Sequence, residues 1–257
     1  MGSVTFPQDF KVAALMGLVQ GVSGFVIAAR AVDIQTIQPP LTIGAGNVLQ
    51  LFAVAEESWE IVSSSGNDAA VGTGARTVAV QYLDADYILH TVVVVLNGIT
   101  AVPIAADCFR HQLSTVLTAG STTNNVGTLT LRVAGGGAVR AIVAPTFGVS
   151  RQGSFTTPAN NRAYIQSTQL IIGKSTGPGV VADIHADVRD PSGVVRTGLD
   201  FTISEPGINL TFPSGISIPE KTTLVYDVAA VSANDTDVSV LTAGLLVDLS
   251  VLNWPLT

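Results

Sequence analysis

The chain has 257 residues, of which 47% are hydrophobic and only 12% are charged, and its net charge is −7. Soluble domains carry roughly a quarter charged residues, so much of this surface is expected to lie against other protein or lipid. A DNA or RNA partner needs a basic footprint, and no basic run occurs. The single cysteine, Cys108, allows no disulfide within the chain and is expected to be a small buried residue.

The N-terminal part contains the one long apolar stretch, residues 10–29. A secretory signal would show a short apolar core followed by small residues. A membrane helix needs ~20 apolar residues, and this stretch just reaches that length while containing Lys11 and Gln20. The third interpretation is an arm that packs on neighbouring subunits, since chain ends are ordered only where something holds them. We expect residues 1–48 to form such an arm, with no cleaved signal and no membrane span.

From residue 49 onward, runs of Val, Ile, Thr and Leu alternate with Gly, Asn, Asp and Pro, which is typical of strands and turns. Their short and regular spacing favours β-sandwiches over a parallel sheet. The continuous apolar run at residues 92–96 predicts a strand with both faces covered. In the first half, strands are expected at residues 59–62, 76–82, 88–96, 111–117, 128–133 and 139–143.

The clearest strand pattern covers residues 181–189, where apolar and polar side chains alternate with the period of a strand that buries one face. A turn at residues 190–193 returns the chain through residues 194–203 as a hairpin. Further strands are expected at residues 163–172, 222–231 and 238–249. The apolar set of the clearest strand is Ala182, Ile184, Ala186 and Val188, and its polar set is Asp183, His185, Asp187 and Arg189.

A boundary near residues 145–153 would leave about one hundred residues on each side, which is an ordinary size for a sandwich. The sequence therefore predicts an all-β fold of two β-sandwich or jelly-roll-like domains. These domains are residues 49–150 and residues 151–257, and the arm of residues 1–48 precedes them.

The sharpest candidate for chemistry is the polar stripe of Asp183, His185 and Asp187. Alternation places them on one face of one strand, ~7 Å apart from i to i+2, where two carboxylates and an imidazole could meet a divalent metal. A solvated or interface-facing stripe is the favoured interpretation, because adjacent side chains diverge and no fourth ligand is visible. No catalytic residue, cofactor or metal is therefore predicted.

Other candidate groups have plainer explanations. The three histidines have no neighbours that would build a triad, and neither a nucleophile elbow nor a phosphate loop occurs. The candidate calcium ligands near the first strands lack the regular spacing of a calcium loop and are expected to be turn-forming aspartates. The candidate glycosidase pair lies close together in sequence, and a turn or strand start explains it better. Each tryptophan is expected to anchor a core or interface. These residues are Asp68, Asp84 and Asp86 for calcium, Glu56, Glu57 and Glu60 for glycoside hydrolysis, and Trp59 and Trp254.

Two stretches carry a resemblance to known proteins. The first includes Gly72-Thr73-Gly74-Ala75-Arg76, Leu83-Asp84 and Leu96-Asn97-Gly98-Ile99-Thr100. The second is built around Pro158-Ala159-Asn160-Asn161 between two strands. Together they cover most of residues 57–250 and resemble structural proteins of tailed bacteriophages. These motifs specify turns and strands, and none of them carries chemistry.

The resemblance implies a virion protein that cements or decorates the capsid, or builds a tail or collar ring, through symmetric contacts. Its partners would be copies of itself and other virion proteins, without nucleic acid, membrane or enzymatic activity. Low charge independently suits a subunit buried among neighbours. The alternative is a receptor- or glycan-binding module of a tail fibre or spike, with aromatic residues exposed at loop ends. An enzyme would need paired carboxylates in a cleft, and an outer-membrane barrel would need an aromatic girdle.

Overall fold

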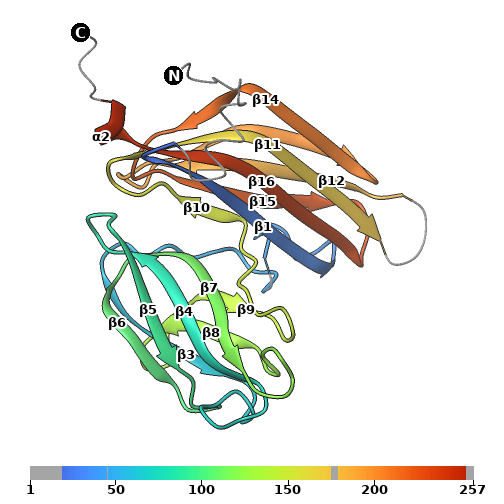
Figure 1. Cartoon of the computed structure of the whole chain (residues 1–257). Helices are drawn as coiled ribbons and strands as arrows, with labels where there is room; N and C mark the ends of the chain where they lie inside the picture. Colours follow the sequence, from blue (N-terminus) through green and yellow to red (C-terminus); the bar gives the residue numbers. More distant parts are fainter. Residues whose placement is uncertain (1–18, 45, 175–178, 253–257) are drawn as a thin grey trace, which may run out of the picture.

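The computed structural model describes residues 19–44, 46–174 and 179–252 of the chain. Within these ranges the protein is all-β, with sixteen strands and one helical turn, α2 (Leu249–Leu252). The strands form four antiparallel sheets. Figure 1 shows that the sheets are arranged as two units. We call the region where the two units meet the seam. The class predicted from the sequence, all-β, is confirmed.

The first unit contains strands β3–β9 and occupies the lower part of Figure 1. Its two sheets have the strand orders β6-β3-β8-β9 and β5-β4-β7. Side chains from both sheets, such as Trp59, Val80 and Leu131, form one buried core. The strands are β3 (Glu57–Ser63), β4 (Ala75–Leu83), β5 (Leu89–Val95), β6 (Val102–Cys108), β7 (Arg110–Ala119), β8 (Leu129–Val133) and β9 (Val139–Val143).

The second unit contains the other nine strands, in sheets of order β1-β16-β11-β14 and β10-β15-β12-β13, with β2 added to β15. A second core between these sheets includes Ile27, Leu170, Ile184 and Tyr226. The strands are β1 (Val22–Ile34), β2 (Leu41–Thr42), β10 (Ser154–Thr156), β11 (Asn161–Lys174), β12 (Val181–Arg189), β13 (Val195–Ser204), β14 (Gly207–Ile218), β15 (Thr223–Val231) and β16 (Thr236–Asp248).

The strands predicted between residues 59 and 249 are present, and their ends differ from the prediction by at most two residues. The alternation along β12 is confirmed, since Ala182, Ile184 and Ala186 are buried. Strands β6 and β14 were not predicted, because Pro103 and Pro213 interrupt their patterns. Both are edge strands, where a missing backbone N–H need not break a ladder.

The prediction that both faces of residues 92–96 are covered is wrong. Val93 and Val95 are 56% and 53% exposed, whereas Val94 and Leu96 are buried. Strand β5 is the edge of a sheet that has a core on one side only. A continuous run of valines therefore supplies one face to the core and an apolar face to the surface.

Part of the segment expected to be an arm lies in the second unit. Strand β1 pairs with β16 from Val22↔Val247 to Ile34↔Thr236, and Leu41 and Thr42 pair with β15. Residues 10–18 of the long apolar stretch lie outside the described residues. Where the chain is described, it contains no helix long and apolar enough to cross a membrane.

Candidate functional site

The predicted polar stripe lies on the outer face of the sheet that contains β12. Thr202 on β13 donates a hydrogen bond of 2.8 Å to Asp183 Oδ1. His185 Nε2 lies 3.4 Å from Asp200 Oδ1. Among the described residues, no group of three His, Cys, Asp or Glu side chains could hold a metal ion. Two of the three residues of the stripe, Asp183 and His185, thus have cross-strand partners on β13.

Asp187, at the other end of the stripe, lies close to a second carboxylate. Its Oδ1 atom is buried without a hydrogen-bond partner. On the neighbouring strand β15, Asp227 accepts a 2.6 Å hydrogen bond from Thr42 Oγ1. Burial raises the pKa of Asp227, and the charge of Asp187 raises it further. This end of the stripe is therefore partly covered by the chain segment that leads from β2 to the first unit.

Asp68, expected to be an ordinary turn residue, organises the loop end of the first unit. It is fully buried, and its carboxylate accepts hydrogen bonds from Ser63 Oγ and from the backbone N–H groups of Ala75, Val126 and Gly127 at 2.6–2.8 Å. Its own carbonyl accepts from Gly98 N–H at 2.7 Å. Two of the turn motifs that carry the phage resemblance thus contact Asp68, one through Ala75 at its carboxylate and one through Gly98 at its carbonyl.

Three of the other acidic candidates, Glu57, Glu60 and Asp84, are engaged in structural contacts. Glu57 pairs with Arg140 and accepts from Trp59 Nε1, and Glu60 pairs with Arg132 at 2.7 Å. Backbone and arginine donors lower the pKa of Glu60, which opposes a general-acid role. Burial raises the pKa of the Cys108 thiol to about 12, so it is a poor nucleophile at neutral pH. Asp84 pairs with His90 at 2.7 Å, Trp59 is a buried core residue, and Trp254 lies outside the described residues.

The seam between the units is organised by a segment that the sequence did not single out, residues 41–53. Phe52 contacts two arginines, with the guanidinium of Arg110 on β7 at 5.4 Å and that of Arg189 on β12 at 5.1 Å from the ring centre. Arg110 also donates to the carbonyl of Ala53 at 2.7 Å. Burial lowers the pKa of Arg110 to about 10. The two cations belong to different units, so one aromatic ring connects them.

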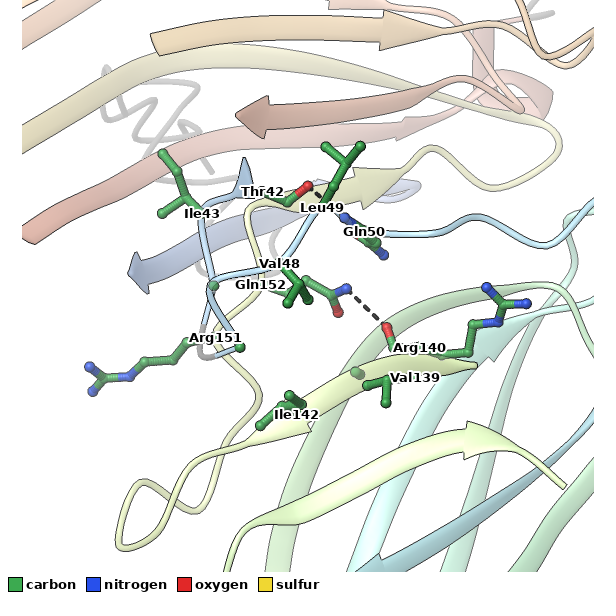
Figure 2. Close-up of a pocket in the computed structure, with 13 residues that line it drawn as sticks. Thr42, Ile43, Val48, Leu49, Gln50, Val139, Arg140, Ile142, Arg151 and Gln152 are labelled. Atoms are coloured by element: carbon green, nitrogen blue, oxygen red, sulfur yellow. Dashed lines mark hydrogen bonds between the residues drawn. The ribbon is translucent and has the colours of Figure 1, made fainter. Parts of the chain in front are cut away.

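A second set of contacts joins the units beside this ring. Figure 2 shows Gln152 Nε2 donating to the carbonyl of Arg140, at 3.0 Å. The Arg140 side chain donates to the carbonyl of Leu51. Gln152 Oε1 also contacts His111 Nδ1 at 2.8 Å, and burial lowers the pKa of His111 to about 4. These polar contacts hold the linker at residue 152 against the first unit.

An uncharged apolar surface covers the outer face of the sheet β5-β4-β7. Strand pairing places Val93 and Val95 beside Ala79 and Thr77, and Leu113 beside Gln81. Charge is absent from the whole outward set of this sheet's three strands. That set, called the outer face of the first unit, consists of Thr77, Ala79, Gln81, Thr91, Val93, Val95, Leu113, Thr115 and Leu117.

The outer face of the sheet β1-β16-β11-β14 also exposes apolar side chains, together with an ion pair. Val26 and Leu241 are exposed there, and Arg30, its one basic residue near the first unit, is paired with Asp237 at 2.7 Å. Between this face and β7 lies a cleft of about 560 Å³, which we call the inter-unit cleft. Its lining mixes apolar side chains such as Leu113 and Val149 with polar and basic ones such as Gln112, Ser239, Arg30 and Arg151.

Comparisons with known proteins identify no family. No family model matches the chain, and no curated protein matches it. Among solved structures, a chain of the infectious bursal disease virus Gx strain aligns at 11% identity and a TM-score of 0.25, covering 99% of this chain and 76% of that chain. The VP2 subviral particle of the same virus gives 13% identity and a TM-score of 0.24, with coverage of 99% and 76%. Scores of this size define neither a shared fold nor a function.

Proposed function

We propose that this protein is a non-enzymatic structural component of a virus particle that assembles through contacts between copies of itself. The observation that carries the proposal is the uncharged outer face of the first unit, where Val93, Val95, Leu113 and Leu117 are exposed side by side. Soluble monomers rarely expose continuous apolar surface of this kind, and such surface marks interaction sites. The central parts of protein interfaces are likewise depleted in charge.

The contacts across the seam support the same proposal. A subunit that repeats in a shell or ring must present its contact surfaces in a constant relative orientation. Phe52 with its two arginines, and the Gln152 contacts, join the two units at several points. The apolar surfaces of the two units would then act as one contact surface.

At finer detail, we propose a tailed-phage virion component that decorates or cements the capsid, or builds a tail or collar ring. Each unit is then a β-sandwich domain, the second jelly-roll-like, and the N-terminal segment acts as an arm on neighbouring subunits. The turn motifs that resemble phage structural proteins support this assignment, and two of them contact Asp68 through Ala75 and Gly98. Antibody labelling of purified particles would separate the two locations, because a capsid protein labels the head and a ring protein labels one vertex or the tail.

The test of assembly is a charge placed on the outer face of the first unit. Val93→Lys is expected to shift purified protein from multimers toward monomers, since a desolvated lysine is costly at an interface. The matched control is Val71→Lys, at a loop position that is 93% exposed. Sedimentation velocity over a concentration series measures the effect. A wild-type chain that stays monomeric at all concentrations would sink the proposal and direct attention to glycan and receptor binding instead.

A further inference from the structure

Strand β5 forms an unprotected sheet edge in the first unit. The edge of a sheet exposes unpaired N–H and C=O groups, and proteins usually block such edges with charged side chains, prolines, bulges or a covering segment. Strand β5 is seven residues long and pairs only with β4, in an unbroken register from Thr77↔Val95 to Leu83↔Leu89. From Thr91 to Val95 it contains neither a charge nor a proline. A flat apolar edge of this kind can pair with another strand.

The other sheet edges in the described ranges each have some protection. Strands β6 and β14 contain a proline, and β1 and β13 combine an exposed arginine with a break in the register of their pairing. Strand β7 is covered by the linker between the units, since Val116 N–H donates to the carbonyl of Gly148 at 2.7 Å. Strand β9 carries Arg140, and β2 and β10 are only two and three residues long. Strand β5 is thus the edge in this part of the chain that stays open.

Two hydrogen bonds beside β5 show which of its residues face the free edge. Leu96 N–H donates to the carbonyl of Arg76 at 2.9 Å, and Asp84 N–H donates to the carbonyl of Ile88 at 3.2 Å. Because bonding alternates along an antiparallel strand, the even-numbered residues of β5 bond with β4 and the odd-numbered ones direct their N–H and C=O groups away from it. The odd-numbered residues are also the exposed ones, namely Leu89, Thr91, Val93 and Val95.

A second copy of β5 is complementary to this edge. Antiparallel pairing about a two-fold axis at Val92 overlaps the whole strand, with Thr91 opposite Val93 and Leu89 opposite Val95 of the second copy. Every residue with free backbone groups then meets another one, which gives about eight hydrogen bonds, two for each opposed pair. The net charge of −7 makes copies repel one another through their charged surfaces, whereas residues 91–95 bring no charge to the contact.

We propose that two copies of this protein pair through β5 and form a two-fold dimer. The three-stranded sheets of the two first units then become one continuous sheet across the axis. The inference rests on the proposed assembly, and it identifies the strand through which copies meet. The outer faces of the two first units would form one larger uncharged surface, which further copies can cover.

A proline at the free edge tests the backbone pairing. Thr91 N–H points away from β4, so Thr91→Pro removes a donor from the dimer contact and leaves the β4–β5 ladder intact, as edge strands tolerate. Each dimer loses two hydrogen bonds, so its dissociation constant in sedimentation velocity is expected to rise roughly tenfold or more. Thr91→Ala keeps the N–H and is the matched control, and circular dichroism checks that both variants are folded.

Cysteine cross-linking tests the register without a proline. Chains carrying Thr91→Cys are mixed with chains carrying Val93→Cys, oxidised mildly and run on a non-reducing gel. Opposed Cα atoms would lie ~5.5 Å apart, within the range that a disulfide spans, so the mixture is expected to cross-link more than either variant alone. Cys108 can remain, since it is buried. Cross-linking no stronger than that of Thr91→Cys mixed with Val71→Cys would overturn the inference.

The combined results separate this inference from the proposed function. If Val93→Lys abolishes assembly while Thr91→Pro leaves the dissociation constant unchanged, the copies meet through a face and not through the β5 edge. The inference then fails and the proposed function stands. If wild-type protein forms no multimers, the proposed function itself fails, and the inference fails with it.

Discussion

The first unit buries charged side chains, whereas the second buries hydroxyl groups between its long strands. In the first, the Asp68 carboxylate holds the end of β3, the start of β4 and the loop before β8 through four hydrogen bonds. In the second, Thr168, Thr242 and Tyr226 share hydroxyl hydrogen bonds of 2.9–3.2 Å. Short strands and long loops leave many backbone N–H groups to satisfy, and one carboxylate satisfies several. Long strands satisfy their own backbone, so the remaining polar contacts are fewer and weaker.

The largest effect is expected from Asp68→Ala, which leaves buried N–H groups without an acceptor. We expect a loss of about 3–5 kcal/mol in the free energy of unfolding of the first unit. Urea unfolding followed by the fluorescence of Trp59, a core residue of this unit, measures it. Asp86→Ala, at an exposed loop position, is the matched control. A loss below about 1 kcal/mol would contradict the role of Asp68 as the organiser of these loops.

Acid should weaken the seam through His111. Burial lowers its pKa from 6.5 to about 4, so the folded state binds fewer protons than the unfolded chain between these values. Stability is therefore full above pH 6.5 and decreases by about 3 kcal/mol as the pH falls to about 4. Urea unfolding at stepped pH measures this slope. His111→Asn keeps a neutral polar side chain and should flatten the curve over this range; an unchanged slope would assign the acid sensitivity to other groups.

Phe52→Ala should uncouple the two units. Two cation–π contacts and the buried ring surface are lost, and we expect about 1–3 kcal/mol of destabilisation. If the units unfold together in the wild type, calorimetry of the variant should show two separated transitions. Phe52→Leu is the matched variant, because it keeps apolar volume and removes the ring. Equal coupling in all three proteins would show that the Gln152 contacts join the units without Phe52.

The smallest effect is expected from Tyr226→Phe. The hydroxyl is removed, but Thr168 and Thr242 still contact each other at 3.0 Å, so each of these two buried hydroxyl groups keeps one hydrogen-bond partner. A loss of about 1 kcal/mol is expected, well below that of Asp68→Ala. The same urea titration measures both, and a larger loss for Tyr226→Phe than for Asp68→Ala would reverse the comparison between the two units.

Much of the fold could be predicted from residue patterns, because a strand with one buried face needs alternation over only a few residues. Strand β12 shows this, with the predicted bounds and the predicted buried face. Strands β6 and β14 could not be found in this way, since their prolines are tolerated only at sheet edges. The exposure of Val93 and Val95 depends on which sheet face has a core behind it, and no local pattern contains that information.

The sequence by itself determined the all-β class, the strand positions and the low charge that points to a covered surface. Only the tertiary structure decided which residues meet. Strand β1 joins β16 across more than two hundred residues, Phe52 meets arginines from both units, and Asp68 gathers N–H groups from distant loops. The physical reason is that strand formation depends on near neighbours, whereas cross-strand pairing and buried polar contacts depend on residues that only the folded chain brings together.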